Sequence, residues 1–246
     1  MRLLSLFSVI TLVIATSCKE QANNEATEET SMDTVATMPE PQEVKVLFDG
    51  ENLEHWKAYN LDSIQLWSVE EGNLVFTPQQ GRKENLITKD RFTNFELNLE
   101  WKISEGGNSG IMWGVQERDD LREPYLTGPE IQVLDNERHP DANVGGKTHQ
   151  AGALYDMIEP AQDVAKPAGE WNKVMIRIDH EANKGVVELN GTQIVEFPVH
   201  GPEWEAMVAD SKFADWKDFG KYRSGHIALQ DHDDKVWYRN ITIREL

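Results

Sequence analysis

The sequence predicts an all-β protein, a jelly-roll β-sandwich of two antiparallel sheets with one short helix. Apolar and polar residues alternate with period two in many short segments, as they do in half-buried antiparallel strands. Glycine-rich turns separate roughly a dozen such segments, which is typical of a sandwich or barrel. Only segment 202–216 has apolar residues near helical spacing. We expect one sheet to bend and form a groove.

The strands are expected in the following order. The clearest is 93–103, in which Phe95, Leu97 and Leu99 alternate with polar residues. Segment 185–197 places Asn190-Gly191 between two apolar runs, which predicts a tight hairpin because both central turn residues need a positive φ. The other expected strands are 44–48, 73–77, 85–88, 109–115, 129–135, 151–157, 171–179, 224–231 and 235–246.

The first residues have the pattern of a secretory signal. Arg2 precedes an apolar run over 3–15, which is shorter than the roughly 20 residues that span a bilayer. Cys18 follows small residues and is the only cysteine in the chain. This arrangement resembles a bacterial lipobox, in which the thiol is lipidated, although Ala15 stands where leucine is usual. We expect a signal peptide over 1–17 and a lipidated Cys18; an ordinary signal is the alternative.

Residues 18–43 are expected to hold the lipidated cysteine and a disordered tether, and residues 44–246 a single domain. Segment 19–43 is rich in Glu and Thr and has no apolar periodicity, so it cannot bury enough apolar surface to fold. The domain has 36 acidic against 22 basic residues. This charge argues against nucleic acid or an anionic membrane face as a partner, which leaves the Cys18 lipid as the expected membrane contact.

Segment 129–136 (PEIQVLDN) places two carboxyl side chains close to an amide. In a regular strand, Glu130, Gln132 and Leu134 share one face and Asp135 points the other way. A β-bulge between Gln132 and Asp135 would return Asp135 to the face of Glu130. The result resembles the catalytic strand of jelly-roll glucanases, with Gln132 in place of their middle aspartate. The alternative is an exposed acidic face.

Two further segments offer side chains suited to sugars. In GGNSGIMWGV (106–115), Asn108 could hydrogen-bond a hydroxyl, and Trp113 could either stack on a pyranose or lie in the core. The glycines around Asn108 indicate a bulge or a close backbone approach. In HQAGALYDM (149–157), His149 and Tyr155 are candidates, and Tyr155 could equally face the core or the groove.

Segment 225–241 (GHIALQDHDDKVWYRNI) begins and ends like a strand but has a strongly polar middle. Alternation places Gln230 and His232 on one face, with Ile227 and Leu229 on the other, towards the core. We therefore predict that Gln230 and His232 face the same groove as Glu130 and Gln132; the alternative is a histidine in an ordinary loop. Arg239 could reach across the groove as a donor fork.

Several classes of chemistry lack their motifs here. The sequence contains no Gly-x-Ser-x-Gly elbow, no phosphate-binding glycine loop, no His-Glu-x-x-His pair and no cysteine nucleophile within the domain. Glu130, Asp135, His149 and His232 could supply metal ligands, but no compact spacing among them specifies a metal.

Taken together, the segments resemble the bacterial 3-keto-disaccharide hydrolase family, long described only as a domain of unknown function. The resemblance covers nearly all of 46–246, through successive blocks such as FDGENLEHWKAYN, LITKDRFTNFELNLEWKIS, GGNSGIMWGV, GPEIQVLDN and GHIALQDHDDKVWYRNI. It implies a concanavalin-like jelly roll, secretion or lipid anchoring, and sugar processing at the periplasm or cell surface of a Gram-negative bacterium. The chain departs from the family pattern at His226, where a proline or small residue is expected.

The resemblance also implies a chemistry. A keto group at C3 of a glucoside acidifies the C2 proton; a base removes this proton, and the glycosidic oxygen leaves C1 with the help of an acid, after which water adds. Glu130 and His232 are the candidates for base and acid, in either order. A divalent cation could replace one hydrogen-bond donor. The remaining candidates, which would bind the oxidised sugar, are Asn108, Trp113, Gln132, Asp135, His149, Tyr155, Gln230 and Arg239.

Two other functions stay open on the sequence alone. One is a non-catalytic carbohydrate-binding module, because the fold does not decide between binding and catalysis. The other is a classical glucanase that uses Glu130 and Asp135 as its carboxylate pair.

Overall fold

The computed structural model describes residues 43–246. The predicted signal peptide, the lipidated Cys18 and all but the last residue of the predicted tether lie outside the described residues. In 43–246, none of the helices has both the length and the apolar character needed to cross a bilayer.

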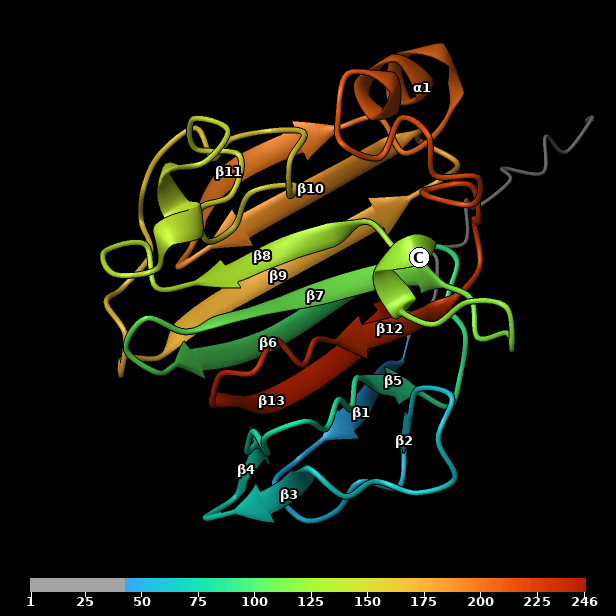
Figure 1. Cartoon of the computed structure of the whole chain (residues 1–246). Coiled ribbons are helices and arrows are strands. Elements are labelled where there is room, and N and C mark those ends of the chain that lie inside the picture. The colour runs from blue at the N-terminus through green and yellow to red at the C-terminus, as the bar shows by residue number, and fades with distance from the viewer. Residues whose placement is uncertain (1–42) are drawn as a thin grey trace, which may run out of the picture. The chain divides into compact units, whose positions relative to one another are not determined.

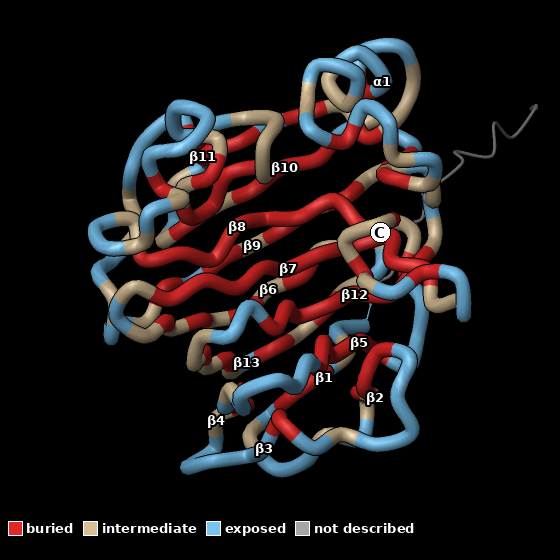
Figure 2. Tube along the Cα trace, in the orientation of Figure 1, coloured by how far each residue is buried: buried red, intermediate tan, exposed pale blue. Residues whose placement is uncertain are grey.

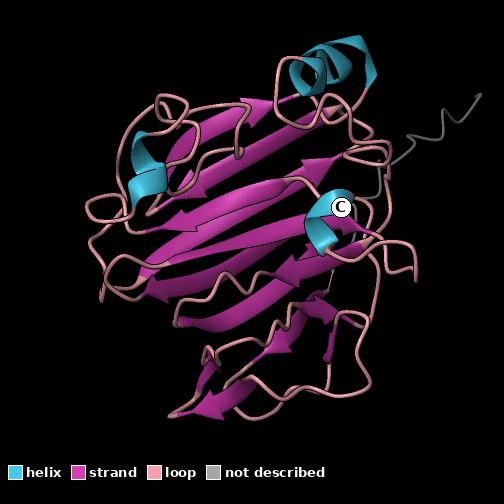
Figure 3. Ribbon diagram, viewed as in Figure 1, coloured by secondary structure: helices cyan, strands magenta, loops and turns pink. Residues whose placement is uncertain are grey.

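The described chain folds as a sandwich of two antiparallel sheets, which confirms the predicted all-β jelly roll (Figures 1 and 3). The larger sheet has the order β11-β10-β9-β6-β13-β4-β3, with β1 also paired to β13, and the smaller has the order β2-β5-β12-β7-β8. The strands are β1 (Val44–Phe48), β2 (Trp56–Ala58), β3 (Trp67–Glu70), β4 (Asn73–Phe76), β5 (Leu86–Thr88), β6 (Phe95–Ile103), β7 (Asn108–Val115), β8 (Glu130–Leu134), β9 (Asn172–Asp179), β10 (Lys184–Leu189), β11 (Thr192–Phe197), β12 (His226–Leu229) and β13 (Val236–Glu245).

The core lies between the two sheets, and buried residues recur along most of the strands (Figure 2). Strand β6 shows the cause, since its odd-numbered residues from Phe95 to Ile103 are buried and the residues between them are half-buried. Trp113 of β7 packs across the gap against Phe197 of β11, with ring centroids 5.7 Å apart. The alternation in the sequence therefore does set which face of each strand enters the core.

Two turns depend on backbone conformations with positive φ. Asn190 and Gly191, with φ of 52° and 82°, connect β10 to β11 and confirm the predicted hairpin. In β13 the register with β6 shifts between Arg239 and Thr242, and Asn240 adopts a φ of 52° at this irregularity. The shift interrupts the strict alternation that was expected along 235–246.

Two of the expected elements differ from the structure, and several short elements were not predicted. The predicted helix over 202–216 is shorter, because α1 (Gly201–Ala209) ends before a series of turns. Segment 151–157 is not a strand, since Gly152 and Asp156 both have positive φ and only Leu154 forms isolated bridges. The short strands β2 and β3 were not predicted, and two single-turn 3-10 helices, η1 (Pro124–Leu126) and η2 (Pro140–Asn143), also occur in loops.

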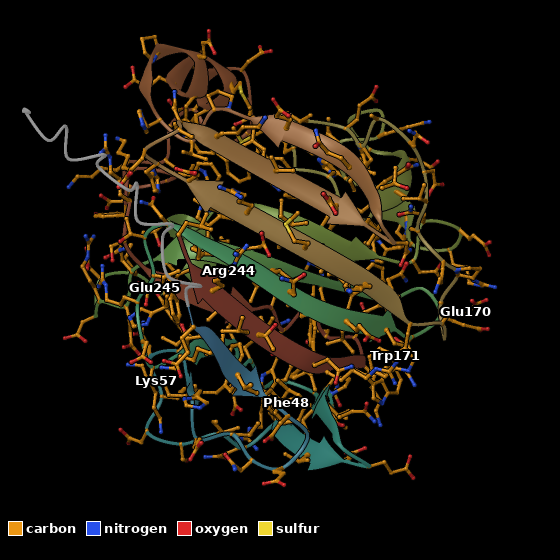
Figure 4. All side chains as sticks on the ribbon, turned by 180° about the vertical axis from the view of Figure 1, so that it is seen from behind. Phe48, Lys57, Glu170, Trp171, Arg244 and Glu245 are labelled. Carbon is orange, nitrogen blue, oxygen red and sulfur yellow. The ribbon has the colours of Figure 1, made fainter. Side chains whose placement is uncertain are left out.

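The outward face of the larger sheet has its own polar and aromatic contacts (Figure 4). Arg239 pairs with Glu100 at 2.7 Å, and its guanidinium lies 4.0 Å from the ring centroid of Trp171. Lys102 lies over Trp171 and over Trp237 at 5.1 and 4.5 Å. These contacts place Arg239 on the side of the sandwich away from the smaller sheet.

Candidate active site

The outer face of the smaller sheet has a cavity of about 440 Å³. Strands β12, β7 and β8 lie side by side in this sheet (Figure 1). Strands β7 and β8 and the segment directly after β12 provide polar side chains to the cavity, while the aromatic ones come from loops. The lining residues are Lys83, Asn108, Glu123, Tyr125, Gly128, Glu130, Gln132, Tyr155, Lys212, Phe213, Trp216, Phe219, Gln230, Asp231 and His232. A site of this size, lined by polar and charged side chains together with aromatic rings, suits a small organic ligand that carries polar groups.

The floor of the cavity centres on a residue without a side chain. Gly110 of β7 pairs with Gln132 of β8, and the backbone N–H of Gln230 donates to the Gly110 carbonyl at 2.9 Å. The two amides therefore flank Gly110. The space above it is filled by Glu130, because a Cβ atom at Gly110 would stand only 1.8 Å from Glu130 Oε1. We call Asn108, Gly110, Glu130, Gln132 and Gln230 the floor.

Glu130 is a buried carboxyl with little compensation. It is 7% exposed and makes no hydrogen bond to the described residues through its carboxyl. Burial raises the pKa of Glu130 to about 8; the positive charge of Lys212 lowers it in part, and Asp141 raises it further. Near neutral pH the carboxyl therefore holds its proton in the free protein.

Two amide oxygens on the floor have no hydrogen-bond partner among the described residues. They are Asn108 Oδ1 and Gln230 Oε1, and both are buried. Such atoms are uncommon, because a buried acceptor without a donor costs roughly 1–3 kcal/mol. Both belong to side chains that line the cavity, so hydroxyl groups of a bound ligand can supply the missing donors.

His232 lies beyond the end of β12 and is exposed at the cavity. The predicted arrangement of this segment is confirmed: Gln230 and His232 line the same cavity as Glu130 and Gln132, and Ile227 and Leu229 are buried in the core. The turn is fixed by Asp231, which accepts from the N–H of Glu84 at 2.7 Å. The ring of His139 lies edge-on to that of His232, with centroids 6.3 Å apart.

Tyr155 reaches the cavity, while His149 lies behind it. The Tyr155 hydroxyl donates to Asp141 at 3.1 Å. His149 bonds Asp141 through Nδ1 at 2.9 Å and Asp156 through Nε2 at 2.8 Å, and it is buried without lining the cavity. Burial, together with the nearby Asp141, raises the pKa of Tyr155. His149 therefore holds the loop that presents Tyr155, rather than contacting the cavity as predicted.

An aromatic wall closes one end of the cavity. It consists of Tyr125, Phe213, Trp216 and Phe219. Phe213 stacks on Phe219 with centroids 3.9 Å apart, and Trp216 packs 5.8 Å from Tyr125. The wall was not predicted, because the apolar spacing near 213 indicates a helix; the density of aromatic residues over 213–219 was the available signal.

Three other predicted substrate contacts do not line the cavity. Trp113 points into the core, which is the alternative that the sequence left open. The bulge that would have turned Asp135 towards Glu130 is absent, since β7 and β8 pair in continuous register from Leu134 to Glu130. The Asp135 side chain instead accepts from the N–H groups of Gly106 and Glu137, which together with Arg138 lower its pKa despite burial. Arg239 lies on the opposite sheet, as described above.

No group of three or more His, Cys, Asp or Glu side chains in residues 43–246 converges as a metal site would. Of the four residues considered as metal ligands, Glu130 and His232 line the cavity, whereas Asp135 and His149 do not.

Comparison with known proteins identifies the relatives of this chain. A family profile described as the 3-keto-alpha-glucoside-1,2-lyase-like domain matches residues 43–244. The chain belongs to this family. A curated 3-keto-disaccharide hydrolase from Bacteroides thetaiotaomicron is 37% identical over 228 residues, covering 81% of this chain and 77% of that protein.

Solved structures support the assignment to the 3-keto-alpha-glucoside-1,2-lyase-like family at the level of fold. A candidate glycosyl hydrolase from Parabacteroides distasonis is 29% identical and superposes with a TM-score of 0.76, covering 82% of this chain and 94% of that one. A second from the same species is 30% identical with a TM-score of 0.62, covering 83% and 100%.

Proposed function

We propose that this protein cleaves the glycosidic bond of 3-keto-glycosides, including 3-keto-disaccharides. Family membership and the curated relative support an enzyme that acts on glycosides. The observation on which the proposal rests is the buried Glu130 carboxyl, whose pKa burial raises to about 8, at the centre of a floor with two unpartnered amide oxygens. A proton donor among hydroxyl-binding groups is what departure of a glycosidic oxygen requires.

The reaction divides into an elimination and a hydration. The C3 ketone makes the C2 proton acidic, so a base removes that proton and the C2–H electrons form an enolate. The enolate then expels the oxygen at C1, the C1–O bond breaks, and an acid protonates the leaving alcohol. Addition of water across the C1–C2 double bond gives the free 3-keto sugar. The first stage alone makes the protein a lyase, and both stages make it a hydrolase.

Glu130 fits the role of acid, because it holds a proton at neutral pH and its carboxyl lies at the middle of the floor. His232 is then the base. Strands β8 and β12 are separated by β7, which puts their axes roughly 10 Å apart, and the Glu130 carboxyl narrows this gap by lying over Gly110. We expect a pyranose ring to bind between these two groups.

The amides of the floor would orient the keto sugar. The unpartnered oxygens of Asn108 and Gln230 can accept from hydroxyls, and the NH₂ groups of Asn108, Gln132 and Gln230 can donate to the enolate oxygen at C3. Arg239 would not contact the sugar, since it lies on the other sheet. A divalent cation at the enolate oxygen stays an alternative to one of these donors.

The two other functions make different predictions. A classical glucanase would need Asp135 beside Glu130, but Asp135 is occupied by two backbone N–H groups and Arg138. A binding module would hold the sugar without turnover. Incubating residues 43–246 with a 3-keto-glucoside and, separately, with the unoxidised glucoside distinguishes them. We expect release of the aglycone only from the keto form; release only from the parent, or from neither, would contradict the proposal.

Variants test the assigned groups. Glu130→Ala and His232→Ala should each lower turnover of the 3-keto-glucoside about a hundredfold or more, the usual scale of general acid–base catalysis. His55→Ala is the matched control, because His55 is a partly exposed histidine that does not line the cavity. Near-wild-type cleavage by both cavity variants would exclude these roles. Separately, NMR resonances of a C1–C2 double bond in the product would show an unsaturated keto sugar and so identify the lyase stage.

The location of the protein also remains a proposal. Lipidation of Cys18 would tether the domain to a membrane at the periplasm or cell surface. Cys18→Ala should move the full-length protein from the membrane fraction to the soluble one after cell breakage. An unchanged distribution would argue against the lipid anchor.

A further inference from the structure

The cavity has two chemically different halves, and Glu130 lies where they meet. On one side are the amides of Asn108, Gln132 and Gln230; on the other is the aromatic wall. The pairing of β7 with β8 places the amides on one side of Glu130. Glu130 pairs with Met112 at the start of β8, whereas Asn108 pairs with Leu134 at its end. The wall adjoins the opposite end of β8, since the N–H of Gly220 donates to the carbonyl of Thr127 at 2.9 Å.

The two halves suit the two parts of a glycoside. The amide half offers unpartnered acceptors for a ring that carries several hydroxyls. If Glu130 protonates the glycosidic oxygen, the bond that breaks lies above Gly110, and the leaving group extends past Glu130 towards the wall. This step rests on the proposed function, because it uses Glu130 as the acid.

The wall offers ring faces but few free polar groups. Trp216 and Tyr125 are half-buried and both line the cavity. Of the charged groups nearby, the Glu123 carboxyl accepts from Asn85 at 2.9 Å, and the Lys212 ammonium lies over the Tyr155 ring at 3.9 Å. Ring faces make up most of the wall, and an aromatic group of a ligand can pack against them directly.

We propose that Trp216 and Tyr125 form a leaving-group subsite that selects glycosides with an aromatic aglycone. The subsite would act on affinity and on the alignment of the C1–O bond with the Glu130 carboxyl. Its effect should therefore depend on the aglycone and not on the keto sugar.

The test compares benzyl and methyl glucosides that are both oxidised at C3. Benzyl alcohol and methanol are alcohols of nearly the same acidity, so the comparison isolates the ring. We expect the wild-type protein to prefer the benzyl substrate about tenfold or more in kcat/KM, the scale of one to two aromatic contacts. Trp216→Ala should reduce this ratio severalfold, and Trp216→Phe should retain most of it because it keeps a ring.

Trp237→Ala provides the matched control. Trp237 is also a half-buried tryptophan, but it lies on the larger sheet and does not line the cavity, so its loss should leave the ratio unchanged. A wild-type ratio of kcat/KM (benzyl over methyl) near one would overturn the proposal. So would a Trp216→Ala substitution that lowers kcat/KM equally for both substrates. If the protein instead prefers a 3-keto-disaccharide to the benzyl substrate, and this preference depends on Trp216, the proposal is overturned and the subsite binds a second sugar.

Calorimetric titration of each substrate gives the same comparison as a ratio of dissociation constants. Binding to the Glu130→Gln variant, which keeps the shape of the side chain, measures that ratio without turnover. Absence of cleavage by the folded wild-type protein would therefore contradict the proposed function, while the binding ratio would still decide the subsite.

Discussion

Replacing Glu130 by glutamine should remove catalysis and, at alkaline pH, stabilise the fold. Burial raises the pKa of Glu130 from 4.5 to about 8 in the folded protein. Because the folded-state pKa lies above the unfolded one, the native state binds the proton more tightly. The resulting stabilisation is complete below pH 4.5 and is lost as the pH rises through about 8.

The size of this effect follows from linkage. At 1.36 kcal/mol for each pKa unit, the full shift corresponds to about 5 kcal/mol of unfolding free energy. Between pH 5 and pH 9 the wild-type protein should lose about 4 kcal/mol through Glu130 alone. Glu130→Gln keeps a side chain of the same shape over Gly110 but does not titrate, so the variant lacks this loss.

Urea denaturation of residues 43–246 at intervals from pH 5 to pH 9 measures the difference. Subtracting the wild-type unfolding free energy from that of the variant cancels the contributions of the other titrating groups. We expect the difference to grow in favour of the variant as the pH rises, while cleavage of the 3-keto-glucoside by the variant stays low throughout. Parallel stability profiles would refute a buried, protonated Glu130, and with it the assignment of the acid.

Three further substitutions probe the same surroundings. Lys212→Met should shift the alkaline limb of the pH–rate profile to higher pH, because the charge of Lys212 lowers the pKa of Glu130; an unchanged limb would contradict this electrostatic interaction. Gly110→Ala should lower kcat/KM at least tenfold with an unchanged circular dichroism spectrum, since its Cβ would stand 1.8 Å from Glu130 Oε1; retained activity would mean that the carboxyl lies elsewhere. Tyr238→Phe should cost about 1 kcal/mol in urea denaturation, because the buried hydroxyl is within 2.8 Å of Ser109 Oγ; a loss within experimental error would argue against this bond.

The sequence predicted the floor of the cavity better than its wall. Alternation along 226–232 correctly separates Gln230 from Ile227 and Leu229, because only one register buries both aliphatic side chains. The same rule applied to β8 correctly places Glu130 and Gln132 on one face. These residues lie in a strand or directly after one, where a local pattern determines which way each side chain points.

Local patterns could not predict the rest. The helical spacing over 202–216 predicted a helix as far as Trp216, but the conformation after residue 210 depends on distant partners. The N–H of Lys212 donates to Asp156, and that of Gly220 to Thr127. The position of Asp135 depended on whether β8 contains a bulge, which its composition does not reveal. Arg239 lies on the outer face because β13 joins the larger sheet, and such pairing is a property of the whole topology.

The separation between floor and wall has a consequence for how such an enzyme can change. The floor lies mainly on three strands that share one hydrogen-bonded ladder, so a shift at one position displaces the others. The wall belongs to two loops, 124–128 and 211–220, which can exchange residues or length without disturbing that ladder. Evolution, or loop grafting in the laboratory, can therefore change which leaving groups such a protein accepts while the residues that break the bond stay in place.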